Sequence, residues 1–193
     1  MITPNREYRA FEFEQKDEMR VEGQAVAFES PTVIAEIDGV EYYEVIDRNA
    51  FDTTDMSDVV LVADHQGKAA ARTRNNTLEL NKTDSGLFIR ADLSKNATRR
   101  ELYEDIKNGF YDKMSFAFTV RKDSFDKKTR TRRILEIDKL FDTSAVTRPA
   151  YEQTSIMARS YFDTEVEKER LEKREREMKK KRLELMLALT KGD

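Results

Sequence analysis

"YDKMSFAFTV", residues 111–120, alternates bulky apolar side chains with smaller ones around a single serine. The alternation predicts a β-strand in which Phe116 and Phe118 lie on the face that packs into the core. Ser115 and Ala117 then share the opposite face, because successive side chains of a strand point to opposite sides. Both side chains are small, so we expect open space beside the Ser115 hydroxyl.

Further strand signals fill the chain before residue 160. Strand length and enrichment in β-branched or aromatic residues mark the segments 20–28, 40–46, 58–64, 86–93, 113–120, 132–142 and 143–147. Turn sequences such as "SPT", "IDGV" and "KTDSG" separate several of them. Short strands joined by turns predict a mainly antiparallel β core of barrel-like form.

One helix is predicted within this β-rich part, in "SKNATRRELYEDIKNGF". Asn96 is a favourable N-cap, and Gly109 stands where the residue after a helix C-terminus would. An apolar stripe runs from Leu102 to Phe110 at intervals of four residues and would face the core. The predicted fold class is therefore α+β: a mainly antiparallel, barrel-like β core with one main internal helix, followed by a charged C-terminal helix.

The C-terminal segment differs in composition, because most of its residues from about 160 onward are charged. Acid-then-base pairs four residues apart, such as Glu169 with Lys173, would each stabilise a helix by about 0.2–0.5 kcal/mol. The apolar residues Leu171, Met178 and Leu185 recur every seven positions, which gives one seam residue per heptad and is too few for a coiled coil. Two interpretations stay open: a solvated helix, or a docking or assembly helix.

Charge elsewhere is balanced except in "SFDKKTRTRR", residues 124–133, which joins two predicted strands and is strongly basic. We interpret it as a solvated hairpin loop, and the alternative is a surface that binds an acidic partner. The whole chain has a net charge of −3, so a nucleic-acid partner is not expected.

The composition excludes several kinds of site. There is no cysteine and only one histidine, so thiol catalysis, cysteine metal sites and multi-histidine metal sites are excluded, and no cofactor is expected. The absence of cysteine also fits a reducing compartment. No run approaches the roughly 18 apolar residues of a membrane span, and the N-terminus lacks an apolar signal core. We therefore expect a soluble, cytosolic protein without a membrane partner.

The residues suited to chemistry are few. His65 follows the apolar segment "VVLVAD" and precedes a turn glycine, where a rigid scaffold can present a functional side chain. A serine hydroxyl such as that of Ser115 needs a base to accept its proton, and His65 is the one imidazole present. A carboxylate would then hold the imidazole tautomer, with Glu136, Asp138 and Asp142 as candidates. Taken singly, a histidine or serine in such a place is more often structural.

Four sequence motifs that occur in a fixed order favour a catalytic role for this histidine and serine over a structural one. They are "GQAVAFES" with "EVIDRNAFD", then "DHQGKAAARTRNNTLELNKTDSGLFIRADL", "IKNGFYDKMSFAFTV" and "LFDTSAVTRPAY". Over about residues 20–152 they resemble the prohead (capsid maturation) serine proteases of tailed bacteriophages, whose core is similar to that of the herpesvirus assembly proteases. Each motif alone is weak, whereas four in order, with the histidine before the serine, are specific.

The resemblance implies a serine endopeptidase, a hydrolase that acts in the host cytoplasm inside the assembling procapsid. Ser115 would be its nucleophile and His65 its general base. Asp142, at the acidic position of the closing motif, would orient His65. The herpesvirus relatives use a second histidine in that third role, which this chain cannot supply, and Asp138 stays an alternative.

Two parts of the chain could supply the oxyanion donors. These are the backbone N–H groups near Phe116 and the residue Arg148 just before Pro149. The sequence alone does not choose between them.

The resemblance also suggests partners and a division of the chain. The expected partners are the major capsid protein and its scaffolding segment, which family members cleave together with themselves, and self-association stays open. Residues 1–159 would form the serine protease domain, and residues 160–193 a charged C-terminal helical extension. The competing hypotheses are a non-enzymatic capsid-assembly or scaffolding protein that keeps the protease fold, and a binding module without chemistry.

Overall fold

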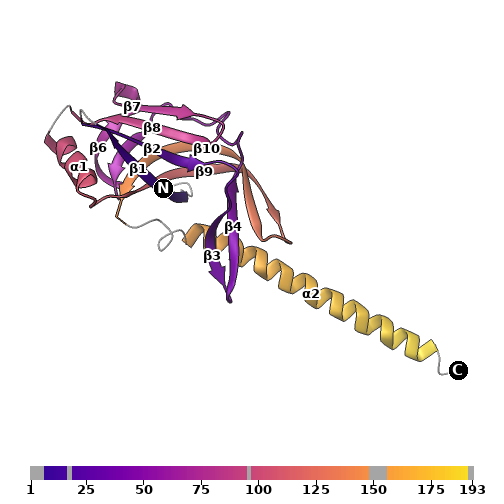
Figure 1. The fold of residues 1–193 in the computed structure, drawn as a ribbon. Helices are drawn as coiled ribbons and strands as arrows, with labels where there is room; N and C mark the ends of the chain where they lie inside the picture. Colours follow the sequence, from indigo (N-terminus) through magenta and orange to yellow (C-terminus); the bar gives the residue numbers. More distant parts are fainter. Residues whose placement is uncertain (1–6, 17–18, 95–96, 148–155, 191–193) are drawn as a thin grey trace.

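The computed structural model describes residues 7–16, 19–94, 97–147 and 156–190. The strands are β1 (Glu7–Lys16), β2 (Arg20–Ala27), β3 (Thr32–Ile37), β4 (Val40–Ile46), β5 (Val60–Ala63), β6 (Gln66–Arg72), β7 (Leu78–Lys82), β8 (Gly86–Asp92), β9 (Lys113–Asp126) and β10 (Thr131–Val146). Within these described ranges a 3-10 turn, η1 (Thr73–Asn75), precedes β7, and the α-helices are α1 (Ala97–Lys107) and α2 (Ile156–Thr190). The predicted α+β class is confirmed: a strand-rich body carries α1 on one side, and α2 extends away from it (Figure 1).

Strand pairing builds one twisted, mostly antiparallel sheet system. Hydrogen-bonded neighbours follow the order β3-β4-β10-β9-β1-β2-β8-β7, and β5 pairs with both β10 and β6. Only the pairings of β10 with β4 and with β5 are parallel among those described. No described pairing joins β3 to β7, so the sheet is open and the expected barrel does not close.

The longest pairing joins β9 to β10, and it corrects two sequence predictions. β10 runs unbroken to Val146, so the division predicted between residues 142 and 143 is wrong. The basic segment 124–133 is mostly strand, with only a short connecting turn. Arg132 in this segment is buried, and its guanidinium bonds Glu44 at 3.3 Å and Asp123 at 2.5 Å. The solvated-loop interpretation is therefore wrong for Arg132, whose charge is matched by carboxylates of its own chain.

The core lies on the face of β9 that the alternation predicted. Phe116 and Phe118 are fully buried, and their ring centroids stack 5.0 Å apart. Leu102 and Ile106 of α1 belong to the same core cluster. Phe110 is 66% exposed, so its predicted place in the apolar stripe is wrong.

The helix α1 ends before Phe110, and a glycine makes the ending possible. Gly109 has φ +76°, a left-handed conformation that costs glycine little, and its N–H donates to the Ile106 carbonyl at 3.1 Å. Because the helix ends at Lys107, Phe110 no longer shares the face of Leu102. The predicted N-cap, Asn96, lies outside the described residues.

Thr143 of β10 faces Phe116 and gives a testable prediction about stability. Its hydroxyl is buried and has no hydrogen-bond partner. An unsatisfied buried hydroxyl costs about 1–3 kcal/mol, and valine has nearly the same shape without the hydroxyl. Thr143→Val should therefore raise the free energy of unfolding by about 1 kcal/mol, measured by urea denaturation. A loss of stability would show that the hydroxyl finds a partner in solution.

The first turns of α2 dock on the β3–β4 and β9–β10 hairpins. Phe162 is fully buried beside Ile34 and Tyr42, and its ring centroid lies 5.0 Å from that of Tyr42. The ion pair of Lys127 with Glu172, at 2.9 Å, lies farther along the helix. The domain boundary predicted between residues 159 and 160 remains a prediction. Phe162, which lies beyond that boundary, packs against the body of the protein.

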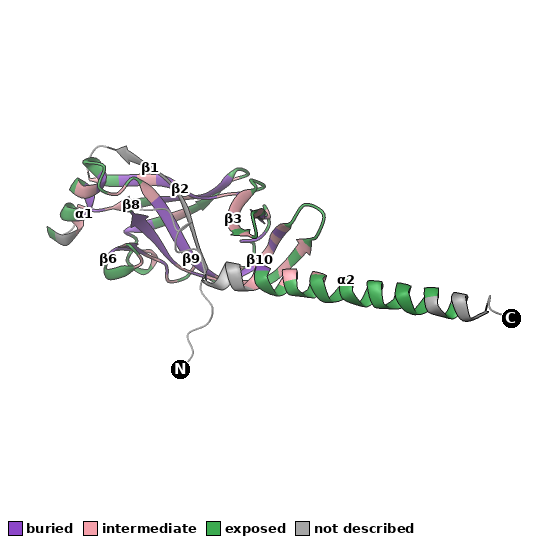
Figure 2. Cartoon of the chain, turned by 90° about the horizontal axis from the view of Figure 1, so that it is seen from below, coloured by how far each residue is buried: buried purple, intermediate pink, exposed green. Residues whose placement is uncertain are grey.

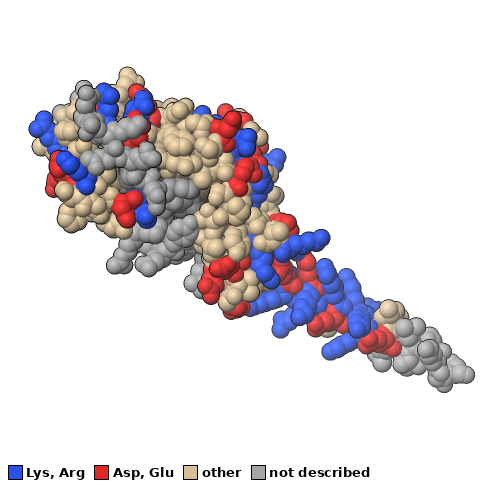
Figure 3. All heavy atoms as spheres, in the orientation of Figure 1, with Lys and Arg blue, Asp and Glu red and all other residues tan. Residues whose placement is uncertain are grey.

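Beyond this docked part, α2 extends into solvent. Figure 2 shows an almost continuous run of exposed residues, and Figure 3 shows positive and negative side chains intermixed along it. Leu171 is 50% exposed and Met178 is 73% exposed. The solvated interpretation fits this part of the helix, and a docking or assembly role toward a partner stays a prediction.

A substitution at Phe162 should measure how strongly the helix docks. Phe162→Ala removes a fully buried ring and is expected to lower the free energy of unfolding by about 3 kcal/mol. Leu171→Ala is the matched control on the exposed part of the same helix and should change it by less than about 0.5 kcal/mol. Urea denaturation of both variants checks this, and equal effects would contradict the docking.

Candidate active site

His65 lies in the two-residue turn between β5 and β6. Ala63 pairs with Gln66 across the turn, and the intervening Asp64 and His65 have φ of 45° and 58°. Positive φ at both central residues is the mark of a type I′ hairpin turn, whose twist matches that of the flanking strands. Asp and His enter this left-handed region more readily than most residues. The turn places the imidazole at the tip of a rigid hairpin.

The hairpin is held against β10 by its backbone. β5 runs parallel to β10 from the Val60–Asp142 pair to the Ala63–Ala145 pair. The Asp64 N–H donates to the Ala145 carbonyl at 2.9 Å. His65 is therefore positioned over the end of β10 by the chain itself.

Ser115 and Asp142 are placed by the register of β9 and β10. Ser115 lies opposite Ser144, and Ala117 lies opposite Asp142, so these side chains share one face of the sheet. The pairing shifts by one residue between Leu140 and Asp142. Without that shift Asp142 would point to the other face, because a one-residue change of register reverses a side chain.

The three predicted residues meet on this face. His65 Nε2 lies 2.8 Å from Ser115 Oγ, and His65 Nδ1 lies 2.6 Å from Asp142 Oδ1. Ser115 is fully buried, Asp142 is nearly so, and the side chain of His65 is 19% exposed. The imidazole thus joins the hydroxyl to the carboxylate through its two opposite nitrogens, in a largely dry environment.

The two other carboxylates considered lie elsewhere. Asp138 bonds the Arg121 guanidinium at the surface, and Glu136 lies 3.8 Å from Lys122. Asp142 is the one of the three candidates that the structure brings to His65.

A fourth side chain, which the sequence analysis did not assign, also reaches the imidazole. Ser144 Oγ lies 2.8 Å from Asp142 Oδ1 and 3.0 Å from His65 Nδ1. It lies within the closing motif, two residues after the carboxylate and therefore on the same side of the strand. Strand alternation would have placed it beside Asp142.

The turn that carries His65 also has an acidic neighbour. The Tyr111 hydroxyl lies 3.4 Å from Asp64 Oδ2. Burial raises the pKa of Tyr111, and the Asp64 carboxylate raises it further. The phenol therefore stays protonated at neutral pH and can donate to Asp64.

The expected open space beside the nucleophile is absent in this conformation. Ser115 and Ala117 are both fully buried, so that prediction is wrong, and a substrate must displace whatever covers the hydroxyl. β9 is also paired on both sides at Phe116, with Arg9 of β1 and Thr143 of β10. Its amides thus face partner strands, which disfavours Phe116 as an oxyanion donor. Arg148 lies outside the described residues.

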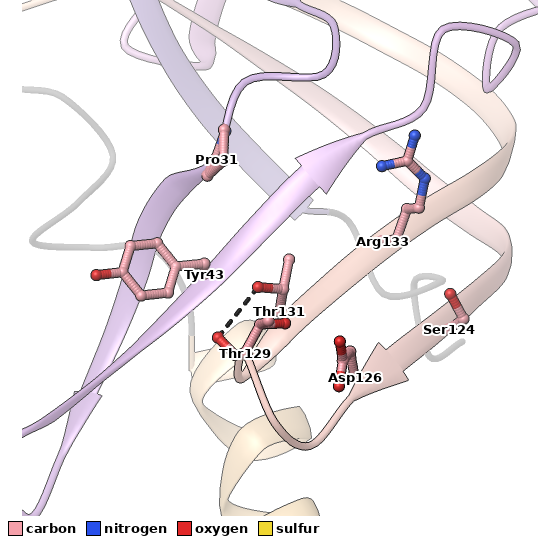
Figure 4. Close-up of a pocket in the computed structure, with 7 residues that line it drawn as sticks. All are labelled: Pro31, Tyr43, Ser124, Asp126, Thr129, Thr131 and Arg133. Atoms are coloured by element: carbon pink, nitrogen blue, oxygen red, sulfur yellow. Dashed lines mark hydrogen bonds between the residues drawn. The ribbon is translucent and has the colours of Figure 1, made fainter.

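A separate shallow hollow lies near the β9–β10 turn, between that hairpin and β4 (Figure 4). Its lining residues are Pro31, Tyr43, Ser124, Asp126, Thr129, Thr131 and Arg133. It shares no residue with the His65 site. Within the described ranges, no three His, Cys, Asp or Glu side chains converge to hold a metal ion. No helix in the described part of the chain is long and apolar enough to cross a membrane.

Comparisons with known proteins agree with the motifs. The comparisons with curated proteins and with solved structures each found no match. The family model described as caudovirus prohead serine protease matches residues 6–176, which contain His65, Ser115 and Asp142. Such a protease acts in capsid maturation, inside the procapsid in the host cell, and is associated with capsid proteins. With a match over most of its length, the chain belongs to the caudovirus prohead serine protease family.

Proposed function

We propose that this chain is a serine endopeptidase in which Ser115 is the nucleophile, His65 the general base and Asp142 the group that orients His65. The observation that carries the proposal is the bridging imidazole, 2.8 Å from Ser115 Oγ and 2.6 Å from Asp142 Oδ1. A hydroxyl, a base and an orienting group within hydrogen-bond reach form the arrangement that activates a serine.

The proposed reaction is acyl transfer. Ser115 Oγ attacks the carbonyl carbon of the scissile bond while its proton passes to His65 Nε2. The tetrahedral intermediate collapses, the C–N bond breaks, and the proton on Nε2 goes to the leaving amine. Water then attacks the acyl-enzyme with His65 again as base, which releases the acid product and restores Ser115. Asp142 stabilises the imidazolium formed in each half.

The proposed substrates are the scaffolding segment of the major capsid protein and this chain itself. Membership of a prohead protease family supports the association with capsid proteins. Self-cleavage requires one copy to reach another or to open its own site. The exposed part of α2 is the accessible candidate segment, since most of its described residues are coloured as exposed in Figure 2.

Co-expression with the cognate capsid protein tests the proposal. Intact mass spectrometry should find a shortened capsid protein with the wild-type chain and only the full-length protein with Ser115→Ala. Ser124→Ala is the matched control, because Ser124 lies on the same strand, is exposed and lies away from His65. It should cleave as the wild type does.

The same experiment separates the competing hypotheses. If capsid protein stays full length with every variant while assembly still depends on this chain, the non-enzymatic scaffolding role replaces the protease. If Ser115→Ala still cleaves, the nucleophile is another residue. A serine-directed phosphonate should label the wild type at Ser115, whereas a binding module would stay unlabelled.

A further inference from the structure

Ser144 lies at the centre of the site without an assigned role. It is fully buried on β10, its Cα partner across the sheet is Ser115, and it shares the face that carries Asp142. Its hydroxyl contacts two members of the proposed triad, Asp142 Oδ1 at 2.8 Å and His65 Nδ1 at 3.0 Å. The ring nitrogen that it contacts is Nδ1, whereas Nε2 is the nitrogen that faces the nucleophile.

For an ionised Asp142 and a neutral imidazole, counting protons among these atoms leaves one arrangement. A hydroxyl has one proton to donate and an ionised carboxylate has none, so Ser144 donates to Asp142. His65 Nδ1 lies 2.6 Å from the same carboxylate oxygen and must therefore carry a proton, because two acceptors at that distance would repel. The Nδ1–H proton then lies between Asp142 Oδ1 and a lone pair of Ser144 Oγ. Nε2 is left unprotonated and free to accept the proton of Ser115.

We propose that Ser144 is a positioning residue that fixes the Asp142 carboxylate and, through it, the Nδ1–H tautomer of His65. The hydroxyl prevents the carboxylate from rotating away and adds a second acceptor for the Nδ1 proton. Its catalytic consequence rests on the proposed protease function, whereas its effect on the tautomer does not.

Kinetics provide the first test. Ser144→Ala should lower kcat by about tenfold to a hundredfold, the scale of one hydrogen bond to a charged group, and leave KM unchanged. Ser144→Thr keeps the hydroxyl and should recover most of kcat. Thr143→Val, which removes the adjacent buried hydroxyl on the opposite face, is the matched control and should leave kcat unchanged.

The single histidine gives a direct second test. Chains labelled with ¹⁵N-histidine show only the imidazole of His65, so its tautomer can be read by NMR without ambiguity. Both samples carry Ser115→Ala to prevent self-cleavage, with Ser144 either kept or replaced by alanine. The Nδ1–H form should predominate with Ser144, and the Nε2–H form should grow when Ser144 is removed.

The NMR outcomes test the positioning role of Ser144 even if the protein hydrolyses no peptide. A predominant Nε2–H tautomer in the chain that keeps Ser144 would overturn the inference. This outcome needs no Ser144 variant, so it holds even if Ser144→Ala fails to fold. An unchanged tautomer after Ser144→Ala would overturn it as well. A changed tautomer in these samples, together with a wild-type chain that cleaves no capsid protein, would support the positioning role and reject the proposed protease.

Discussion

His65→Ala is expected to lower kcat/KM for peptide hydrolysis by about a millionfold. The imidazole is the one group that contacts both Ser115 and Asp142 through its ring nitrogens. No second histidine exists in the chain to replace it. The measurement is the hydrolysis of a fluorogenic peptide taken from the mapped cleavage site.

Two controls sharpen that result. Gln66→Ala changes an exposed residue on the same hairpin and should keep nearly full activity. The double variant with His65→Ala and Ser115→Ala should be no slower than either single variant, because triad residues act as a unit. Additive losses would mean that the two residues contribute separately, which would contradict the proposed base.

Asp142→Asn is expected to lower kcat by about 10⁴-fold, with a smaller change in KM. The amide removes the negative charge that stabilises the imidazolium. Its NH₂ group can also donate to His65 Nδ1, which selects the tautomer with the proton on Nε2 and blocks proton transfer from Ser115. Single-turnover kinetics on the same peptide check the size of the effect.

Asp138→Asn is the matched control, because it makes the same chemical change on the same strand. Asp138 bonds Arg121 at the surface instead of His65, so the rate should stay within about twofold of wild type. If Asp138→Asn were the slower variant, Asp142 would be a structural carboxylate and the strand would have to rearrange in solution.

Part of the fold was predictable from the alternation of side chains along the strands. Phe116 and Phe118 predicted their strand and its buried face correctly. β1, by contrast, was not among the predicted strands, although "EYRAFEFEQK" places charged residues among its aromatic ones. Helix periodicity overextended α1 to Phe110, because the left-handed Gly109 ends the helix first.

The residue types of the site and their order along the chain were predictable from the sequence, but the geometry of the site was not. Nothing in "ADHQGK" shows that two non-glycine residues in succession adopt positive φ. Nothing in "KLFDTSAV" shows the one-residue shift that turns Asp142 toward Ser115. Both features depend on long-range pairing of β10, which a local pattern does not contain. Ser144 could have been found from simple alternation after Asp142.

His65 lies outside the β9–β10 hairpin, and this affects the order in which the proposed triad forms during folding. Ser115 and Asp142 meet when a short local turn closes, whereas His65 reaches Asp142 only through a pairing across 77 residues. Local contacts form faster than distant ones, so a folding chain should first bring together the proposed nucleophile and the orienting carboxylate, without the proposed base. On refolding, hydrolysis should therefore lag behind the gain of β-structure by circular dichroism. During that interval a newly made copy would lack the base that the proposed cleavage of its neighbours and of itself requires.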